Sequence, residues 1–287
     1  MSRFASLAAE SRLVPVYRRL FADALTPLSA FARLDAGESA CLFESVVGGE
    51  RVGRYSFLGA DPFLRLEARG RRVRVTTGVS VEECDSADPL AELERRVAAY
   101  RPARLPELPP FTSGAVGFAA YDSVRYVERL PDAPSDDLGL PDLDFAFYDR
   151  LVVFDNATKA IDVVVLARIE DASEAGVEEA YAKACRRIDE TISRLAAPSD
   201  WPPPADIGPR HEPRCLTDGS AVSVFGREPF LAAVKQAIEY IKAGDVFQVV
   251  LSRRLDVPFT GHALEIYRTL RVVNPSPFMF YLRSPAC

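Results

Sequence analysis

Apolar residues in the first half of the chain recur mainly at every second position or in short continuous runs, and both spacings are typical of β-strands. The segments ACLFESV and RYSFLGADPF predict two short strands that the turn signal Gly48-Gly49 separates. The segment FLRLEARGRRVRVTTG predicts a hairpin, because its apolar residues fall on one face and its arginines on a solvated face. The apolar face is formed by Leu64, Leu66, Ala68, Val73 and Val75.

Further strand regions follow before the middle of the chain. The segment FTSGAVGFAAYD predicts a strand in which Gly114 and Gly117 permit close packing. Asp122 is the expected N-cap of a short helix, SVRYVERL. The segments LDFAFYDRLVVFD and AIDVVVLARI flank the polar loop 156–159, which predicts another hairpin.

Helical periodicity, with apolar residues at steps of three and four, marks four segments. They are PLAELERRVAAY, the stretch 177–195, REPFLAAVKQAIEYIKAGD and HALEIYRTLRVVN. The third has Pro229 in its first turn and Gly244 at its stop, both common at those positions. In the same part of the chain VFQVVLSRRLDV and MFYL predict strands.

The order of these elements predicts the fold class and the division of the chain. Strands outnumber helices in the first half and do not alternate with them, so we expect an α+β fold with stacked antiparallel sheets and outer helices. Residues 198–219 are dense in proline and predict a connector, with Trp201 as an anchor on a domain surface. We therefore expect an N-terminal domain over 1–197 and a second domain that starts at 220 and runs to 287.

Composition narrows the class of protein. Apolar residues make up 48% of the 287 residues and charged residues 26%, as in ordinary globular proteins. The net charge of −6 argues against a general binder of nucleic acid or of anionic membranes, and no stretch has the length and apolar character of a membrane span. The five cysteines are scattered and form no C-x-x-C pair, which favours the reducing cytoplasm and argues against a disulfide framework or a zinc site.

Local motifs do not by themselves predict a reaction. The sequence contains no G-x-x-x-x-G-K-[ST] phosphate loop and no G-x-S-x-G nucleophile elbow. The two glycines of GAVGFA are better explained by packing, and the acidic pairs at 82–83, 136–137 and 178–179 by solvated surfaces. These features indicate an α+β protein but do not by themselves indicate its function.

Four longer stretches resemble a known family. LFESVVGGERVGRYSFLGADPF, GAVGFAAYD, GDVFQVVLSRR and VNPSPFMFYL are similar, in this order, to anthranilate synthase component I, and the resemblance covers nearly the whole chain. It implies an enzyme that forms anthranilate and pyruvate from chorismate and ammonia, with Mg²⁺ as cofactor. It also implies a glutamine amidotransferase subunit that supplies the ammonia, and feedback inhibition by tryptophan.

The resemblance also implies where tryptophan binds. In the family, the serine of an L-x-E-S run and the N-P-S-P-aromatic-Met run line the regulatory site; here these are Ser45 and Pro277, Phe278 and Met279. An indole ring needs flat apolar walls and one hydrogen-bond acceptor, methionine packs well on aromatic rings, and prolines keep a wall pre-formed. The ammonium and carboxylate of the ligand need polar partners, for which the candidates are Glu44, Ser45, Asn274 and Arg54. The alternative is a turn that leads into a core strand.

Gln248 is the candidate catalytic residue of this chain. The resemblance implies that relatives which use water carry a lysine here, in G-x-x-x-[KQ]-V-V-L, as a base, whereas ammonia users carry glutamine. Glutamine cannot take a proton from water, so Gln248 favours ammonia chemistry. A structural amide hydrogen-bonded within a strand is the other interpretation.

The family continues well beyond the region that the chain matches. The resemblance places the magnesium ligands, the catalytic histidine and most chorismate contacts in that further part, so we expect a truncated component I that is inactive alone. Two alternatives stay open. One is 4-amino-4-deoxychorismate synthase component I, which Met279 disfavours because those relatives tend to have a small residue there. The other is a stand-alone tryptophan-binding regulatory module.

Overall fold

The computed structural model describes residues 2–21, 23–35, 37–45, 53–199, 203, 222–223 and 225–287. The chain divides into two compact units: Met1–Pro203 together with Tyr267–Cys287, and Pro204–Ile266. Most of the expected connector at 198–219, including Trp201, lies outside the described residues, as does the Gly48-Gly49 turn. In the described ranges no helix combines the length and the apolar character that a bilayer crossing requires.

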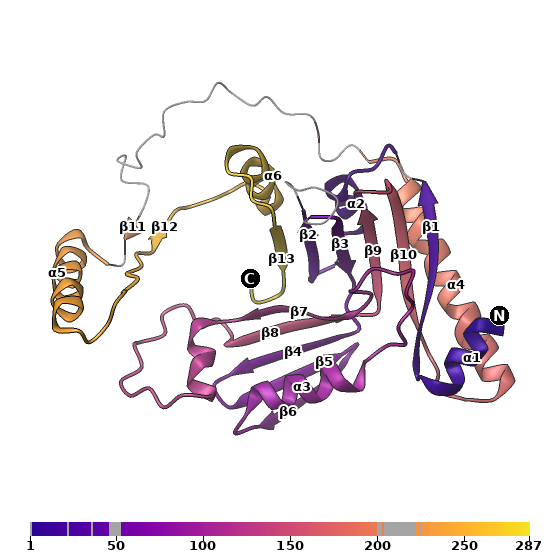
Figure 1. Cartoon of the computed structure of the whole chain (residues 1–287), viewed down its shortest axis with the longest axis horizontal. Coiled ribbons are helices and arrows are strands. Elements are labelled where there is room, and N and C mark those ends of the chain that lie inside the picture. Colours follow the sequence, from indigo (N-terminus) through magenta and orange to yellow (C-terminus); the bar gives the residue numbers. More distant parts are fainter. Residues whose placement is uncertain are drawn as a thin grey trace. The chain divides into compact units, whose positions relative to one another are not determined.

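The first unit contains a six-stranded antiparallel sheet (Figure 1). Its order is β1 (Leu13–Phe21), β10 (Ala160–Arg168), β9 (Arg150–Asp155), β3 (Tyr55–Ala60), β2 (Ala40–Glu44) and β13 (Met279–Arg283). β9 and β10 form the hairpin predicted around 156–159, and β2 pairs with β3 as adjacent strands. The last strand joins a partner from the beginning of the chain, so distant parts of the sequence share this sheet.

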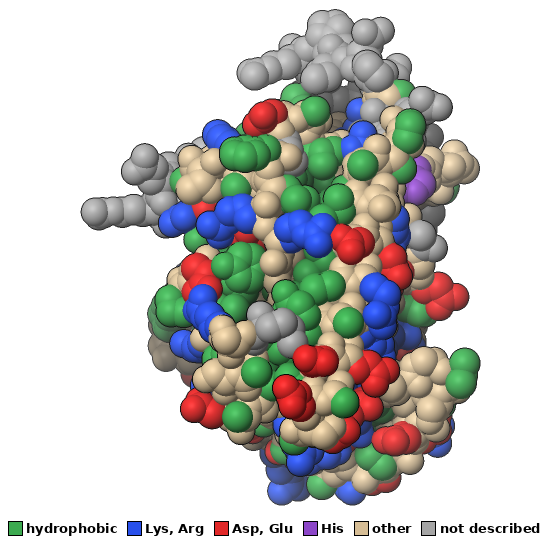
Figure 2. Space-filling model, turned by 90° about the vertical axis from the view of Figure 1, so that its right-hand side faces the viewer, with side chains coloured by type: hydrophobic (Ala, Val, Ile, Leu, Met, Phe, Trp, Pro, Cys, Tyr) green, Lys and Arg blue, Asp and Glu red, His purple; other side chains and the backbone are tan. Residues whose placement is uncertain are grey.

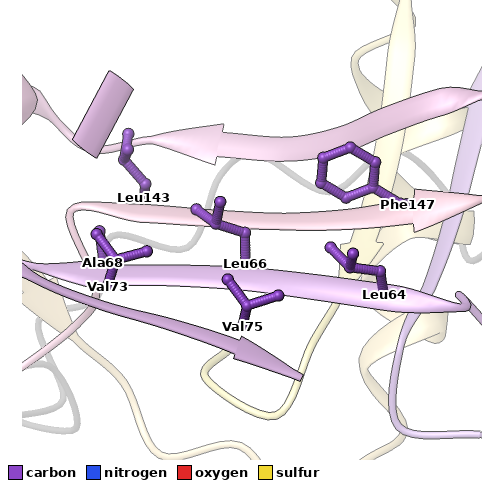
Figure 3. Packing of buried hydrophobic residues seen from close by; sticks show 7 residues of the cluster. All are labelled: Leu64, Leu66, Ala68, Val73, Val75, Leu143 and Phe147. Carbon is purple, nitrogen blue, oxygen red and sulfur yellow. The ribbon is translucent and has the colours of Figure 1, made fainter. Parts of the chain in front are cut away.

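A five-stranded antiparallel sheet forms the second layer of this unit. Its order is β6 (Ser80–Asp85), β5 (Arg72–Thr77), β4 (Leu64–Arg69), β8 (Leu143–Tyr148) and β7 (Gly114–Ala119). The predicted hairpin is confirmed as β4 and β5, with Leu66 opposite Val75 and Ala68 opposite Val73. Its apolar face is the core of this layer, which Figure 3 shows with Leu143 and Phe147 of β8. Helix α3 (Pro89–Ala99) packs Leu90 and Leu93 against that core.

The two sheets are joined where β8 passes into β9. The segment LDFAFYDRLVVFD is therefore two strands in two different sheets, divided at Asp149. Side chains from both sheets form one apolar cluster that includes Cys41 of β2, Tyr148 of β8 and Leu151 of β9. The strands of the two sheets run in crossing directions in Figure 1. The expected α+β fold with stacked antiparallel sheets and outer helices is confirmed.

Helices cover the outside of the six-stranded sheet. α4 (Glu174–Ala196) is the predicted long helix, and its Ala184, Ile188 and Leu195 are buried. Beside it lie α2 (Pro27–Leu34) and α1 (Ser2–Glu10), and Phe4 of α1 packs edge-on against Tyr181 of α4. The face that carries these helices intersperses acidic and basic side chains with apolar ones (Figure 2). Arginines of this region pair with carboxylates, for example Arg18 with Asp189 at 2.6 Å.

The structure tests the roles predicted for two glycines of β7 and for Asp122, which follows this strand. A Cβ on Gly117 would lie 1.9 Å from the carbonyl oxygen of Asp144 on β8, so the expected close packing is confirmed there. Gly114 adopts a φ of 140°, which favours glycine. Asp122 is not an N-cap: the short helix is a 3₁₀ turn, η1 (Tyr121–Tyr126), whose N-cap is Ala120, and Asp122 instead accepts a hydrogen bond from Arg125 at 2.7 Å.

In the second unit one predicted helix is confirmed and one predicted strand is wrong over most of its length. Helix α5 (Arg227–Ala243) ends at Gly244, which adopts the left-handed conformation of a helix stop. The strand predicted from VFQVVLSRRLDV is wrong over 246–254, where the structure has no regular element. Only β12 (Leu255–Asp256) forms, and it pairs with β11 (Val222–Ser223). β-branched residues favour a strand only when neighbouring strands pack beside them, so the pattern alone was insufficient.

Candidate functional site

The C-terminal strand brings the NPSPFMFYL segment against the LFES segment. β13 pairs antiparallel with β2, with Met279 opposite Glu44 and Tyr281 opposite Leu42. Residues directly opposite in a ladder share a face, so these four side chains lie on one face of the sheet. The ring of Tyr281 lies 5.7 Å from that of Phe31 on α2. Met279 and Glu44 are therefore neighbours although most of the chain separates them.

Glu44 is a buried carboxylate that helix α6 (Ala263–Val273) neutralises. The side chain is only 4% exposed. The Tyr267 hydroxyl donates to Oε2 at 2.8 Å, Arg271 Nη2 donates to Oε1 at 3.1 Å, and Arg271 Nε lies 3.0 Å from Oε2. Burial raises the pKa of the Glu44 carboxyl, and the Arg271 guanidinium and the Tyr267 hydroxyl oppose that rise.

Tyr267 and Arg271 were not among the residues predicted from the sequence. The periodicity of HALEIYRTLRVVN placed them on a helix, and they are four positions apart, which puts them on one helix face. That spacing is a local signal. The sequence carries no sign that their partner is Glu44, because the partner lies 223 and 227 positions away.

Ser45 and Arg54 already have partners inside the sheet. The Ser45 hydroxyl donates to the carbonyl oxygen of Tyr55 at 3.1 Å, and its backbone N–H donates to the Ser56 hydroxyl at 3.4 Å. Arg54 donates both Nε and Nη2 to the carboxylate of Asp155, at 3.0 and 2.6 Å. Its guanidinium also lies 4.9 Å from the centre of the Tyr55 ring. A ligand that used Arg54 would have to compete with this fork.

The residues between α6 and β13 are open to solvent. The backbone N–H of Asn274 donates to the carbonyl oxygen of Leu270 at 3.0 Å and so closes the helix. Asn274, Pro277 and Phe278 are exposed, and Met279 is half-buried. Residues 46–52, which follow Ser45 in the chain, lie outside the described residues.

Further contacts hold the C-terminal segment at its far end. Arg283 Nη1 donates to Asp35 beyond α2 at 2.8 Å. The Ser284 hydroxyl donates to Asp144 of β8 at 2.6 Å. The segment therefore contacts both sheets, and β13 is attached to the unit at more points than its ladder with β2.

The structure brings Glu44, Ser45 and Met279 into one region of the first unit. Their roles toward tryptophan, and those of Pro277, Phe278, Asn274 and Arg54, stay predictions. Gln248 belongs to the second unit and is exposed, in the stretch without regular structure. Its catalytic role also stays a prediction.

The family of the chain follows from comparison with known proteins. A model of the chorismate binding enzyme family matches residues 38–286. The chain belongs to the chorismate-binding enzyme family. The match includes the β2–β13 region and the segment around Gln248.

Its similarity to named relatives extends over nearly the whole chain. Anthranilate synthase component 1 of Thermus thermophilus is 41% identical over 94% of this chain and 54% of the relative. The proteins of the same name from Pseudomonas aeruginosa and Acetivibrio thermocellus are 38% and 35% identical, over 97% and 96% of this chain. The chain spans about half the length of these relatives, 55% in the last two cases.

A solved structure shares the fold. Anthranilate synthase component I from Streptococcus pneumoniae superposes with a TM-score of 0.61 at 26% sequence identity. The alignment covers 90% of this chain and 53% of the solved one. The α+β arrangement of two antiparallel sheets therefore corresponds to part of that protein.

Proposed function

We propose that this chain is the N-terminal portion of an anthranilate synthase component I. In the complete enzyme, chorismate and ammonia would give anthranilate and pyruvate for tryptophan synthesis. The main structural support for this proposal is the β2–β13 ladder, which puts Met279 of the NPSPFMF motif opposite Glu44 of the LFES motif. The names of the relatives support the reaction.

We propose further that the β2–β13 region binds tryptophan as a feedback inhibitor. Met279 supplies a polarizable side chain that suits an indole face, and Pro277 restricts the backbone beside it. Glu44 supplies a buried negative charge for an ammonium group, which is consistent with an amino acid as ligand. Ser45 can accept a hydrogen bond from the indole N–H, since a hydroxyl that donates once still has acceptor capacity.

Ammonia, magnesium and the partner subunit belong to the same proposal. Ammonia would come from a glutamine amidotransferase subunit, and Gln248 is consistent with ammonia as nucleophile because it is no base toward water. The part of the chain that the structure describes brings no three His, Cys, Asp or Glu side chains together as a metal site. The magnesium ligands are therefore expected in the part of the relatives that this chain does not match.

Calorimetric titration of the 287-residue chain with tryptophan tests the regulatory part of the proposal. We expect saturable binding with one ligand per chain. Phenylalanine should bind much more weakly at the same concentrations, because it lacks the second ring and the N–H donor of indole. If tryptophan gives no saturable heat at millimolar concentration while circular dichroism shows a folded chain, the regulatory assignment is wrong.

A further inference from the structure

The carboxylate of Glu44 is held from one side by a single helix. Tyr267 and Arg271 lie one turn apart on α6 and contact the same carboxylate at 2.8 to 3.1 Å, Tyr267 at Oε2 and Arg271 at both oxygens. Arg271 donates one charge-assisted hydrogen bond through Nη2 and places its Nε within ion-pair distance of the other oxygen. Two side chains from successive turns thus define both the position and the orientation of the carboxylate.

A carboxylate this deeply buried would protonate without such partners. Taking an unpaired charge out of water is costly, and proteins avoid the cost by pairing the charge or neutralising it. Among the described residues, the charged and titratable groups that face Glu44 are Arg271 and Tyr267 of α6. Opposite it, β13 offers the uncharged Met279. The ionised state of Glu44 therefore depends mainly on α6.

The partners leave room for one more donor. A carboxylate has about four acceptor positions on its two oxygens. The Tyr267 hydroxyl takes one of them and Arg271 Nη2 takes another, whereas Arg271 Nε lies within ion-pair distance of Oε2 without a hydrogen bond. These two hydrogen bonds leave acceptor capacity on the carboxylate for an ammonium group.

We propose that Tyr267 and Arg271 are positioning residues of the tryptophan site, which keep Glu44 in place as an anion so that it binds the ammonium group of the ligand. This inference rests on the proposed tryptophan binding. It adds a specificity rule, because a site of this kind favours tryptophan over an indole compound without an amino group. It also joins ligand binding to the attachment of α6, since one carboxylate serves both.

The quantity to be measured is the ratio of the affinity for tryptophan to the affinity for indole-3-propionate. Tryptophan and indole-3-propionate share the indole ring and the carboxylate, but only tryptophan has an ammonium group. Calorimetry should show that the parent chain binds tryptophan at least about tenfold more tightly, the usual effect of a charged hydrogen-bonding partner. In Arg271→Gln the ratio should fall by about tenfold, and in Tyr267→Phe by a smaller factor, while Arg271→Lys should restore part of it.

Measuring tryptophan affinity at a series of pH values distinguishes loss of the positioning of Glu44 from a general loss of structure. Tryptophan needs the ionised form of Glu44, so its affinity should fall as the pH drops through the pKa of that carboxyl. Without the guanidinium the pKa of Glu44 rises further, and the fall in Arg271→Gln should begin at a higher pH than in the parent. The affinity for indole-3-propionate should not follow this shift.

Arg19→Gln is the matched control. Arg19 also pairs with a buried carboxylate, that of Asp162, to which its Nε and Nη2 donate at 2.8 and 2.9 Å, near the other edge of the same sheet. The Arg19→Gln substitution should leave the ratio of tryptophan to indole-3-propionate affinity, and the pH dependence of that ratio, unchanged. If Arg271→Gln does not fold by circular dichroism, Tyr267→Phe decides, because it removes one hydroxyl and keeps the ring.

The outcomes are distinguishable. Tight tryptophan binding by the parent with an unchanged ratio in folded Arg271→Gln and Tyr267→Phe would overturn the positioning role alone. A parent that does not bind tryptophan would overturn both this inference and the proposed regulatory function. A reduced ratio in the two α6 variants, with the control unchanged, would support the assignment.

Discussion

Four buried carboxylates among the described residues each form an ion pair with an arginine. Asp162, Asp155, Asp144 and Glu44 are at most 7% exposed, and their partners are Arg19, Arg54, Arg65 and Arg271. Removing one partner from such a pair is destabilising mainly because it leaves the other charge buried and uncompensated. These pairs therefore give predictions with a definite sign.

The pair of Arg54 and Asp155 predicts a pH-dependent stability. The Arg54 hydrogen bonds, aided by N–H groups of the following turn, lower the pKa of Asp155 to about 2. A carboxyl with a lowered pKa stabilises the fold above its unfolded value of about 3.9 and loses that contribution as the pH falls through about 2. Arg54→Gln should reduce the free energy of unfolding by about 1 kcal/mol near neutral pH, because the arginine is partly solvated.

Urea unfolding of parent and Arg54→Gln at several pH values measures this difference. It should be constant above pH 5 and shrink between about pH 4 and pH 2. Arg74→Gln removes an exposed pair with Glu83 and should show little difference at any pH. A difference for Arg54→Gln that stays the same at pH 2.5 and pH 7 would contradict the assigned cause.

Ser45 and Met279 predict graded losses of tryptophan binding. Met279→Ala should weaken binding by about 1–3 kcal/mol, the usual size of lost apolar burial and sulfur–aromatic contact. Ser45→Phe should weaken it more, because the larger side chain fills the space expected for the ligand. Calorimetric titration measures both, with Val81→Ala on the exposed β6 strand as control. Parent-like dissociation constants in both folded variants would mean that these residues do not line the site.

At the scale of elements, β13 is the strand whose attachment is least local. Its ladder with β2 is supplemented by ring contacts on one face, where Tyr281 lies 5.7 Å from Phe31 and 6.0 Å from Tyr267. On the other face Phe280 is 64% exposed, although it lies 6.2 Å from Phe43. Alternation along the strand thus separates a packed side from a solvated one.

This alternation predicts unequal effects of two neighbouring substitutions. Tyr281→Ala should lower the free energy of unfolding by about 2–3 kcal/mol, because it removes a half-buried ring between α2 and α6. Phe280→Ala should cost less than about 1 kcal/mol. Chemical denaturation of both variants beside the parent gives the comparison. Equal losses, or a larger loss for Phe280→Ala, would contradict the packing described here.

At the scale of the whole molecule, the chain comprises two compact units and matches about half the length of its relatives. The first unit holds the two sheets and the β2–β13 region. The second unit, over the described residues, has one long helix and a two-stranded ladder. The site proposed for tryptophan and the residue proposed for ammonia chemistry, Gln248, therefore belong to different units.

We predict that the purified 287-residue chain forms no anthranilate from chorismate, magnesium and ammonium at high pH. The described residues bring no three His, Cys, Asp or Glu side chains together, and the chain spans 54% of the Thermus thermophilus relative, so we expect the main catalytic residues in the part that it does not match. Anthranilate fluorescence measures turnover, with the full-length Thermus thermophilus relative as positive control. Turnover by the purified chain above the enzyme-free blank would show that the chemistry lies within these residues.

Local periodicity in the sequence was enough to predict several elements of this protein. The β4–β5 hairpin, helices α3, α4, α5 and α6, and strand β13 follow from apolar spacing and from stop residues such as Gly244. It was not enough for β1 or α2: Pro15 and two arginines interrupt the alternation of β1, and α2 is only 8 residues long. The family motifs, by contrast, were enough to identify the LFES and NPSPFMFYL segments as the two parts of the candidate site.

Tertiary structure decided what no local pattern contains. It divided one apolar run into β8 and β9 of different sheets, left 246–254 without a strand, and gave Asp122 a salt bridge in place of a cap. It also paired Glu44 with Tyr267 and Arg271 across more than two hundred positions. A helix or hairpin satisfies its backbone within a few residues, so neighbouring residues encode it. A ladder between strands far apart in the sequence, such as β2 and β13, or a buried charge such as Glu44, is satisfied only by a distant partner, and that partner is known only once the chain has folded.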